Sequence, residues 1–193
     1  KIDFLKDNIF KIIKDINPDI IINCIAERQN EICENDWNLT KKINIDIPNN
    51  ISRVCGLLDI FMIHLSTDYV YDGKTPPFTS SSETNPLQNY GISKLTGELI
   101  FKMLGKHNIK YTIFRLFNVY GPGQDLSNLK QGMLSIYISQ ALKSNIINIT
   151  GSLDRIRDFI YIDDVISLLT SKKIKDNTIY NIGLGKIIKV EKA

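Results

Sequence analysis

Histidine and cysteine are scarce in this 193-residue sequence, which narrows the chemistry that it can carry. The three cysteines, Cys24, Cys33 and Cys55, form no C-x-x-C pair, and no group of His, Cys or carboxylate residues has the spacing of metal ligands. We therefore expect no metal site. An odd cysteine count favours a reducing compartment over a disulfide framework, so a cytoplasmic protein is expected. His64 lies in an apolar strand and His107 near a helix end, and structural roles are expected for both.

The sequence also lacks a long apolar stretch and a strong charge of either sign. No segment approaches the roughly 20 apolar residues of a membrane span, and no signal peptide opens the chain. The net charge of +3 is spread along the sequence and forms no basic stripe. These features predict no membrane partner and no nucleic-acid partner. The content of 43% hydrophobic and 23% charged residues is typical of a single α/β domain.

Helical and strand periods alternate along the chain, which is typical of a parallel sheet with helices on both faces. Residues 20–26, IIINCIA, form an apolar run that is expected to be a strand buried on both faces. Further strands are predicted at 61–66, 111–117, 146–149, 157–162 and 178–183. Helices are predicted at 3–19, at 36–55 with a break at Pro48, at 90–107, at 131–144 and from Asp163 onward.

A tyrosine and a lysine stand four residues apart in QNYGISKLTGE, residues 88–98. Positions i and i+4 share one face of a helix, so Lys94 can lie near the Tyr90 phenol. A phenol has a pKa of about 10, and a nearby positive charge lowers it by roughly 1 to 3 units, which suits a proton donor and acceptor. The spacing alone is not specific, because a chain with eight tyrosines and many lysines often contains it by chance. The alternative is a simple surface pair on a helix.

Thr67 adds a hydroxyl that could act on a substrate together with Tyr90 and Lys94. It follows the strand predicted at 61–66, and the loops after strand ends are where an open α/β sheet binds ligands. A Ser/Thr, Tyr and Lys set suits hydride transfer at a carbinol, because the alcohol proton must leave as the hydride departs to a nicotinamide. The sequence therefore predicts Thr67, Tyr90 and Lys94 as catalytic residues. The alternative for Thr67 and Asp68 is that they only cap a turn.

Four blocks of the sequence resemble the extended short-chain dehydrogenase/reductase superfamily, in its NAD-dependent epimerase/dehydratase branch. These blocks span nearly the whole chain in the family's order: PDIIINCIAE (18–27), HLSTDYVYDG (64–73), NPLQNYGISKLTGE (85–98), and RLFNVYGPGQD with DRIRDFIYIDDV (115–125 and 154–165). The resemblance implies an α/β fold with a Rossmann-like doubly wound parallel sheet. It further implies that this fold is truncated at the N-terminus and carries the start of a small substrate-binding domain.

The resemblance implies a role for each matching residue. Thr67 would hydrogen-bond the sugar C4 oxygen, Tyr90 would be the acid/base, and Lys94 would lower the Tyr90 pKa and hold the nicotinamide ribose. The resemblance also implies that NAD is the cofactor, with NADP possible, that a nucleotide sugar is the substrate, and that the full-length protein is a homodimer. The remaining implied contacts are to the cofactor at Asp3, Phe4, Ala26 and Leu116, and to the substrate at Asp68, Asn118 and Arg157.

The sequence departs from the family at its glycine-rich phosphate loop. No G-x-x-G-x-x-G is present, and the chain opens at Lys1 without a Met, as an interior fragment would. Residues 1–193 are expected to be one NAD(P)-binding Rossmann-type domain that lacks its first βαβ unit. Substrate-binding elements are expected in about 119–160 and after 183. Because the glycine loop supplies backbone donors to the pyrophosphate, this chain is expected to bind NAD poorly.

The reaction stays open between two enzymes and a non-catalytic role. STDYVYDG resembles the dTDP-4-dehydrorhamnose reductases, whereas NVYGPGQD and RDFIYIDDV resemble the UDP-sugar 4-epimerases. The epimerase-like blocks cover more residues, which favours an NAD-dependent UDP- or dTDP-sugar 4-epimerase of polysaccharide biosynthesis. Tyr69 stands where the dehydratases carry a glutamate, so water elimination is not expected. AERQ (26–29) resembles a non-catalytic subunit of methionine adenosyltransferase, but the intact Thr67, Tyr90 and Lys94 argue against such a role.

Overall fold

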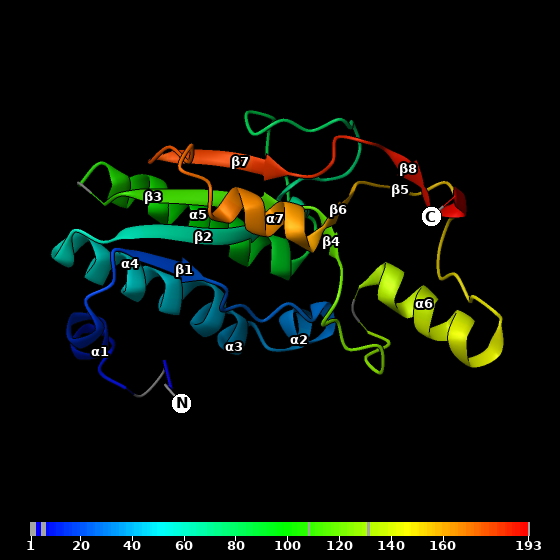
Figure 1. The fold of residues 1–193 in the computed structure, drawn as a ribbon, viewed down its shortest axis with the longest axis horizontal. Helices are drawn as coiled ribbons and strands as arrows, with labels where there is room; N and C mark the ends of the chain where they lie inside the picture. Colours follow the sequence, from blue (N-terminus) through cyan, green and yellow to red (C-terminus); the bar gives the residue numbers. More distant parts are fainter. Residues whose placement is uncertain (1–2, 5–6, 108, 131, 193) are drawn as a thin grey trace. The chain divides into compact units, whose positions relative to one another are not determined.

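The computed structural model describes residues 3–4, 7–107, 109–130 and 132–192, which form two compact units (Figure 1). The first unit comprises Lys1–Arg115 and Lys175–Asn181, and the second comprises Leu116–Ile174 and Ile182–Ala193. Within the described residues, no helix has the length and the apolar character needed to cross a membrane.

A four-stranded sheet forms the centre of the first unit (Figure 1). β1 and β2 pair in parallel, with Asn23 opposite His64, so the chain has the α/β class with a parallel sheet that the sequence predicts. Because parallel strands end at the same edge of a sheet, the ends of β1 and β2 bring their polar residues together. The spatial order is β1 (Ile20–Asn23), β2 (Phe61–Thr67), β3 (Tyr111–Leu116) and β7 (Thr178–Ile182).

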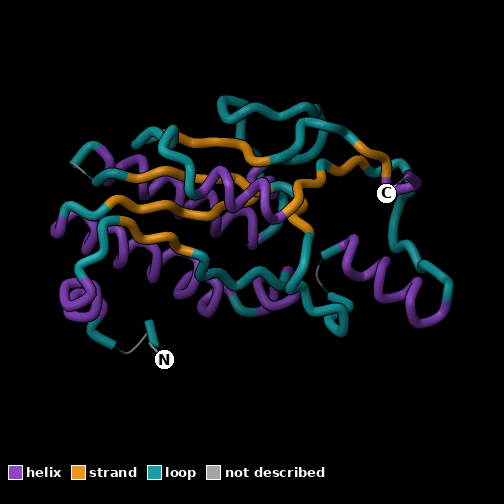
Figure 2. Tube along the Cα trace, in the orientation of Figure 1, coloured by secondary structure: helices purple, strands orange, loops and turns teal. Residues whose placement is uncertain are grey.

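Helices of the first unit pack beside this sheet (Figure 2). They are α1 (Ile9–Ile16), α2 (Asn30–Asn35), α3 (Trp37–Lys41), α4 (Ile47–Leu58) and α5 (Asn89–Gly105). The main apolar core joins α4 and α5 to the strands through buried side chains that include Ile51, Met62, Phe101 and Ile113. The helix predicted at 3–19 is wrong at its start among the described residues, because the Asn8 side chain accepts from the Lys11 N–H and caps α1.

The helical segment predicted at 36–55 is divided near Pro48. α3 passes into a π-helix, η1 (Lys42–Asp46), before α4 begins at Ile47. Proline has no N–H to donate to the carbonyl four residues back, and the Ile47 N–H bonds to the Lys42 carbonyl five residues back. The wider turn leaves Asn44 fully buried inside the first unit.

Strand β1 is shorter and more exposed than the apolar run predicted it to be. It ends at Asn23, and Ile20 and Ile22 are 53% and 43% exposed. Alternate residues of a strand point to opposite faces, and the face of Ile21 and Asn23 packs against the core. The prediction of a strand buried on both faces is therefore wrong, because the apolar core of this unit lies on one side of β1.

Among its described residues, the second unit contains two small sheets and two α-helices, α6 (Met133–Ser144) and α7 (Ile162–Leu169). β4 (Asn118–Tyr120) pairs in parallel with β6 (Phe159–Tyr161), and β5 (Ile156–Arg157) pairs antiparallel with β8 (Ile188–Lys189). The strand predicted at 146–149 is wrong. Residues 146–149 form a loop, in which the Asn148 N–H donates to the Gln140 side chain and not to a neighbouring strand.

Candidate active site

Helix α5 brings Tyr90 against the end of strand β2, where Thr67 lies. Gly91 permits this close approach, because a Cβ there would overlap the Tyr69 backbone oxygen and lie 3.0 Å from the Pro86 side chain. The glycine beside the tyrosine is thus a packing requirement of the site.

The Tyr90 phenol lies beside the Thr67 hydroxyl. Burial raises the pKa of Tyr90 to about 12, the hydrogen bond with Thr67 opposes the rise, and the charge of Asp68 adds to it. The Tyr69 ring packs edge-on against the Tyr90 ring, with centroids 5.9 Å apart. At neutral pH the phenol is protonated and able to donate a proton, whereas the sequence predicts a pKa lowered by Lys94. Lys94 is not among the groups that shift this pKa in the structure, and burial raises it.

Lys94 is almost fully buried, and its amine contacts an imidazole. The Lys94 Nζ is 3.3 Å from the His64 Nε2. Burial lowers the pKa of Lys94 to about 8, while the charges of Glu98 and Cys24 act to raise it. The lysine predicted to be catalytic is therefore a base that titrates near neutral pH.

Two asparagines that sequence reasoning missed hold this site together. The Asn23 Nδ2 lies 3.0 Å from the His64 Nδ1 at the end of β1. Asn44 accepts the Glu27 N–H at 2.7 Å and donates to the Ser93 Oγ at 2.9 Å, so it ties the loop after β1 to α5. An asparagine inside an apolar run, as in IIINCIA, is a signal that could have identified Asn23.

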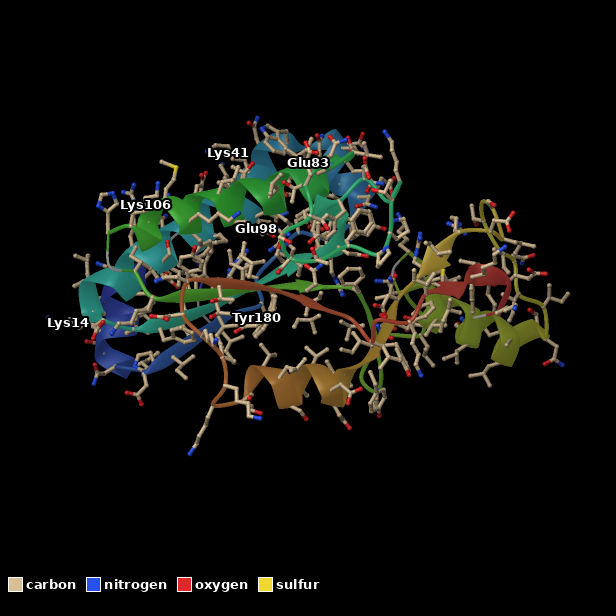
Figure 3. All side chains as sticks on the ribbon, turned by 90° about the horizontal axis from the view of Figure 1, so that it is seen from above. Lys14, Lys41, Glu83, Glu98, Lys106 and Tyr180 are labelled. Atoms are coloured by element: carbon tan, nitrogen blue, oxygen red, sulfur yellow. The ribbon has the colours of Figure 1, made fainter. Side chains whose placement is uncertain are left out.

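A buried ion pair lies one turn beyond Lys94 on α5. Glu98 is on α5 (Figure 3). The Arg115 Nη2 is 2.6 Å from the Glu98 Oε2, and the exposed side-chain fractions are 2% and 0%. Burial opposes the charge of Arg115, but the hydrogen bonds and charge of Glu98 outweigh it and raise the Arg115 pKa. Ser66 donates to Glu98 at 2.6 Å, and Arg115 donates to the Tyr71 hydroxyl at 2.7 Å. The pair therefore fixes the end of β2, next to Thr67, to α5 and β3.

The predicted cofactor contacts at the start of the chain lie in irregular backbone. Asp3 is exposed and its N–H donates to the Asp7 carboxylate at 2.7 Å, while Phe4 is half-buried against the apolar core. Ala26 is half-buried in the loop after β1, and Leu116 ends β3 and belongs to the second unit. The roles of these four residues stay predictions.

The predicted substrate contacts Asn118 and Arg157 come close together within the second unit. Asn118 stands opposite Phe159 in the β4–β6 pair, and its Nδ2 donates to the Asp158 carbonyl at 3.1 Å. Arg157 is half-buried and donates to the Ile156 carbonyl at 2.8 Å. Their contacts to substrate stay predictions. Across the described ranges, no three or more His, Cys, Asp or Glu side chains are grouped to hold a metal ion.

The family model described as the NAD dependent epimerase/dehydratase family matches residues 1–183. This chain belongs to that family. The UDP-N-acetylglucosamine 4-epimerase of Methanobrevibacter ruminantium is 25% identical, with a TM-score of 0.91 over 99% of this chain and 62% of that chain. The UDP-glucuronic acid 4-epimerase of Bacillus cereus, solved with UDP-glucuronic acid and NAD, is 27% identical, with a TM-score of 0.86 over 99% of this chain and 61% of that chain.

Curated relatives of two further kinds match the sequence. Methionine adenosyltransferase 2 subunit beta of Xenopus laevis is 31% identical over 89% of this chain and 50% of its own length. The probable low-salt glycan biosynthesis reductase Agl14 of Haloferax volcanii is 36% identical over 64% of this chain and 40% of its own length. The chain thus spans half or less of these two relatives and about three fifths of the two epimerases.

Proposed function

We propose that the protein is an NAD-dependent nucleotide-sugar 4-epimerase, which inverts the configuration at C4 of a UDP- or dTDP-sugar. The observation that carries the proposal is the contact between the Thr67 hydroxyl and the Tyr90 phenol, with the buried Lys94 one turn further along α5. The likeness to two UDP-sugar 4-epimerases supports it.

The donors of this site fit a nicotinamide cofactor. The Lys94 amine contacts an imidazole and not a carboxylate, so its N–H groups are available to ribose hydroxyls. Tyr90 and the loop of Ala26 would hold the cofactor together with Lys94. NAD, when bound, supplies the acceptor and donor of a hydride.

Thr67 and Tyr90 would handle the proton of the C4 hydroxyl. Tyr90 takes this proton while the carbon is oxidised and returns it when the carbon is reduced, and Thr67 donates a hydrogen bond to the same oxygen. A phenol with a pKa of about 12 carries its proton at neutral pH, and almost none of it is present as the phenolate that could accept one. The ammonium of Lys94, turned toward the phenol, would lower that pKa and make the oxidation step possible.

A nucleotide-sugar reductase is the second candidate. The Haloferax relative and the STDYVYDG block favour it. A reductase needs Tyr90 only as a proton donor, which agrees with the raised pKa of its phenol. It differs from an epimerase by consuming one NAD(P)H for each product.

The deciding experiment follows sugar stereochemistry and reduced nicotinamide in the same reaction. UDP- and dTDP-hexoses are incubated with the full-length protein and NAD, and then dTDP-4-keto sugars with NADPH and NADH. Inversion at C4 without net change in cofactor supports the epimerase. Stoichiometric loss of reduced cofactor with a 4-keto sugar, and no inversion of hexoses, assigns the reductase. No turnover of either kind would favour a non-catalytic role like that of a subunit.

Tyr90→Phe tests whether this site carries out the chemistry. The variant keeps the ring and loses the proton donor, so turnover is expected to fall by about 10²- to 10⁴-fold with little change in nucleotide-sugar affinity. The matched control is Tyr180→Phe, on β7, whose hydroxyl accepts the Lys175 N–H (Figure 3). Near-normal turnover in Tyr90→Phe would remove this residue from the mechanism.

A further inference from the structure

Asn23 determines which nitrogen of His64 carries the ring proton. The Ile25 backbone N–H can only donate, and it donates to the Asn23 Oδ1 at 3.1 Å, which fixes the orientation of the amide. The Asn23 Nδ2, which is only a donor, then faces the His64 Nδ1 at 3.0 Å. The Nδ1 must accept this bond, so the proton of a neutral His64 ring is on Nε2.

The protonated Nε2 of His64 faces the Lys94 amine at 3.3 Å. An imidazole N–H and an ammonium group are both donors, so the two residues form a hydrogen bond only when Lys94 is a neutral amine with a free lone pair. Both side chains are buried, with exposures of 0% and 1%. Burial also lowers both pKa values, that of Lys94 to about 8 and that of His64 well below its ordinary value, so the neutral pair is the main form above about pH 8 and Lys94 is mostly an ammonium at pH 7.

The charged and titratable groups around Lys94 come from three elements. His64 is on β2, Cys24 follows β1, and Glu98 is one turn further along α5. The Glu98 charge favours the ammonium form, but its carboxylate is already bound by Arg115 and Ser66, each at 2.6 Å. The nearest hydrogen-bonding contact that the structure gives the Lys94 amine is thus the imidazole.

We propose that His64, oriented by Asn23, is a positioning residue that holds Lys94 while its amine is neutral and releases it when the amine gains a proton. On taking a proton from solvent, Lys94 becomes a donor and loses its bond to the His64 Nε2–H. The ammonium then turns to acceptors such as ribose hydroxyls or a phenolate. The consequence for turnover rests on the proposed function, whereas the tautomer of His64 does not.

Nitrogen-15 NMR of the histidine rings tests the tautomer without any assay of activity. The sequence has two histidines, so the exposed His107 is removed by His107→Gln, and the signals that remain belong to His64. The expected result is a neutral ring with its proton on Nε2, maintained below pH 6.5, the ordinary pKa of the residue. A proton on Nδ1, or on both nitrogens at neutral pH, overturns the proposal.

His64→Gln tests the effect on Lys94. The glutamine oxygen accepts from an ammonium, so the Lys94 pKa is expected to rise by about one unit, whereas His107→Gln leaves it unchanged. The alkaline limb of kcat/KM, expected near pH 8 in the native protein, moves up by the same amount. If the protein has no turnover, the proposed function fails, and titration of the carbon-13 Cε signal of Lys94 gives the comparison. Equal Lys94 titration in the native protein and His64→Gln overturns the role of His64.

Discussion

Two buried cations of the first unit, Arg115 and Lys94, have opposite environments. Arg115 is bound by the carboxylate of Glu98, whereas Lys94 meets the imidazole of His64. Burial acts against both charges. The carboxylate outweighs burial and raises the pKa of Arg115, while the pKa of Lys94 falls to about 8.

This difference separates a charge that holds the fold from a charge that can change. Arg115 and Glu98 join β2, α5 and β3 through a fixed set of hydrogen bonds. Lys94 has no such fixed charge, because its pKa lies close to physiological pH. Acid–base chemistry requires groups of that kind, and they cluster at functional sites. Helix α5 carries both kinds within one turn, at Lys94 and Glu98.

The largest expected effect comes from removing the carboxylate that binds Arg115. Glu98→Gln preserves the shape of the side chain but leaves Arg115 buried without its counter-charge, so the free energy of unfolding should fall by about 3 to 5 kcal/mol. Urea denaturation at pH 7 measures the loss.

The matched control for Glu98→Gln is Asp46→Asn, in an exposed ion pair with Lys41 at 2.8 Å. It should cost less than about 1 kcal/mol, because water screens that pair. Equal losses in the two variants would mean that burial of the Arg115 pair has no special weight. Glu98→Gln should also lower the pKa of Lys94 further, since the Glu98 charge acts to raise it.

Sequence reasoning could predict the helix of the site because its signals are local. The Tyr90 and Lys94 spacing, the polar loop before it and the apolar strands on either side predict a helix at 90–107, and α5 at Asn89–Gly105 confirms it. The strands predicted at 61–66 and 111–117 are likewise confirmed by β2 and β3. Family membership, implied by four sequence blocks, is confirmed over residues 1–183.

The environment of Lys94 was not predictable in the same way, because it joins residues that are far apart in sequence. Asn23 and His64 are 41 positions apart, and His64 and Lys94 are 30 apart. The sequence predicts a structural role for His64, and only the folded chain shows that its imidazole faces the lysine. Glu98 and Arg115 are on different elements, so no periodic pattern indicates their pairing.

Lys94→Met tests the cost of burying the charge of Lys94. The variant should stabilise the protein by about 2 kcal/mol at pH 7. The folded-state pKa of Lys94 is about 8 and its ordinary value is 10.5, so between these values the unfolded chain binds more protons. Native stability therefore rises with pH across this window, by about 1.4 kcal/mol per unit at most. Below pH 8 the full penalty of charging the buried amine, measured from its neutral form, is present. Lys94→Met removes this penalty but also lacks the bond that the neutral amine makes to His64, about 1 kcal/mol.

Urea denaturation at pH 7 and pH 10 measures this effect of Lys94→Met. The advantage of the variant should be large at pH 7 and nearly absent at pH 10. The control is Lys102→Met, an exposed lysine of the same helix, which should change stability little at either pH. An advantage for Lys94→Met that does not shrink with rising pH would contradict the lowered pKa.

The smallest expected effect comes from Tyr71→Phe, which removes one acceptor of Arg115 and leaves its carboxylate. The Tyr71 hydroxyl accepts from the Arg115 Nη1 at 2.7 Å, and its ring stacks on Phe78 with centroids 4.5 Å apart. The variant keeps that stacking and loses the hydroxyl, which also donates to the Thr79 carbonyl and the Asn181 Oδ1, each at 2.8 Å, so a loss of about 1.5 kcal/mol is expected in urea denaturation.

Comparison of Tyr71→Phe with Glu98→Gln then shows which partner stabilises the buried charge of Arg115. Tyr69→Phe is the control, since Tyr69 is 39% exposed and its variant should stay within about 0.5 kcal/mol of the native protein. If charge compensation dominates, Tyr71→Phe should cost less than half as much as Glu98→Gln. Equal costs would mean that hydrogen-bond acceptors, and not opposite charge, stabilise Arg115. In that case Lys94 would differ from Arg115 only in the number of its hydrogen-bond acceptors. The carboxylate of Glu98 would no longer explain why the two pKa values shift in opposite directions.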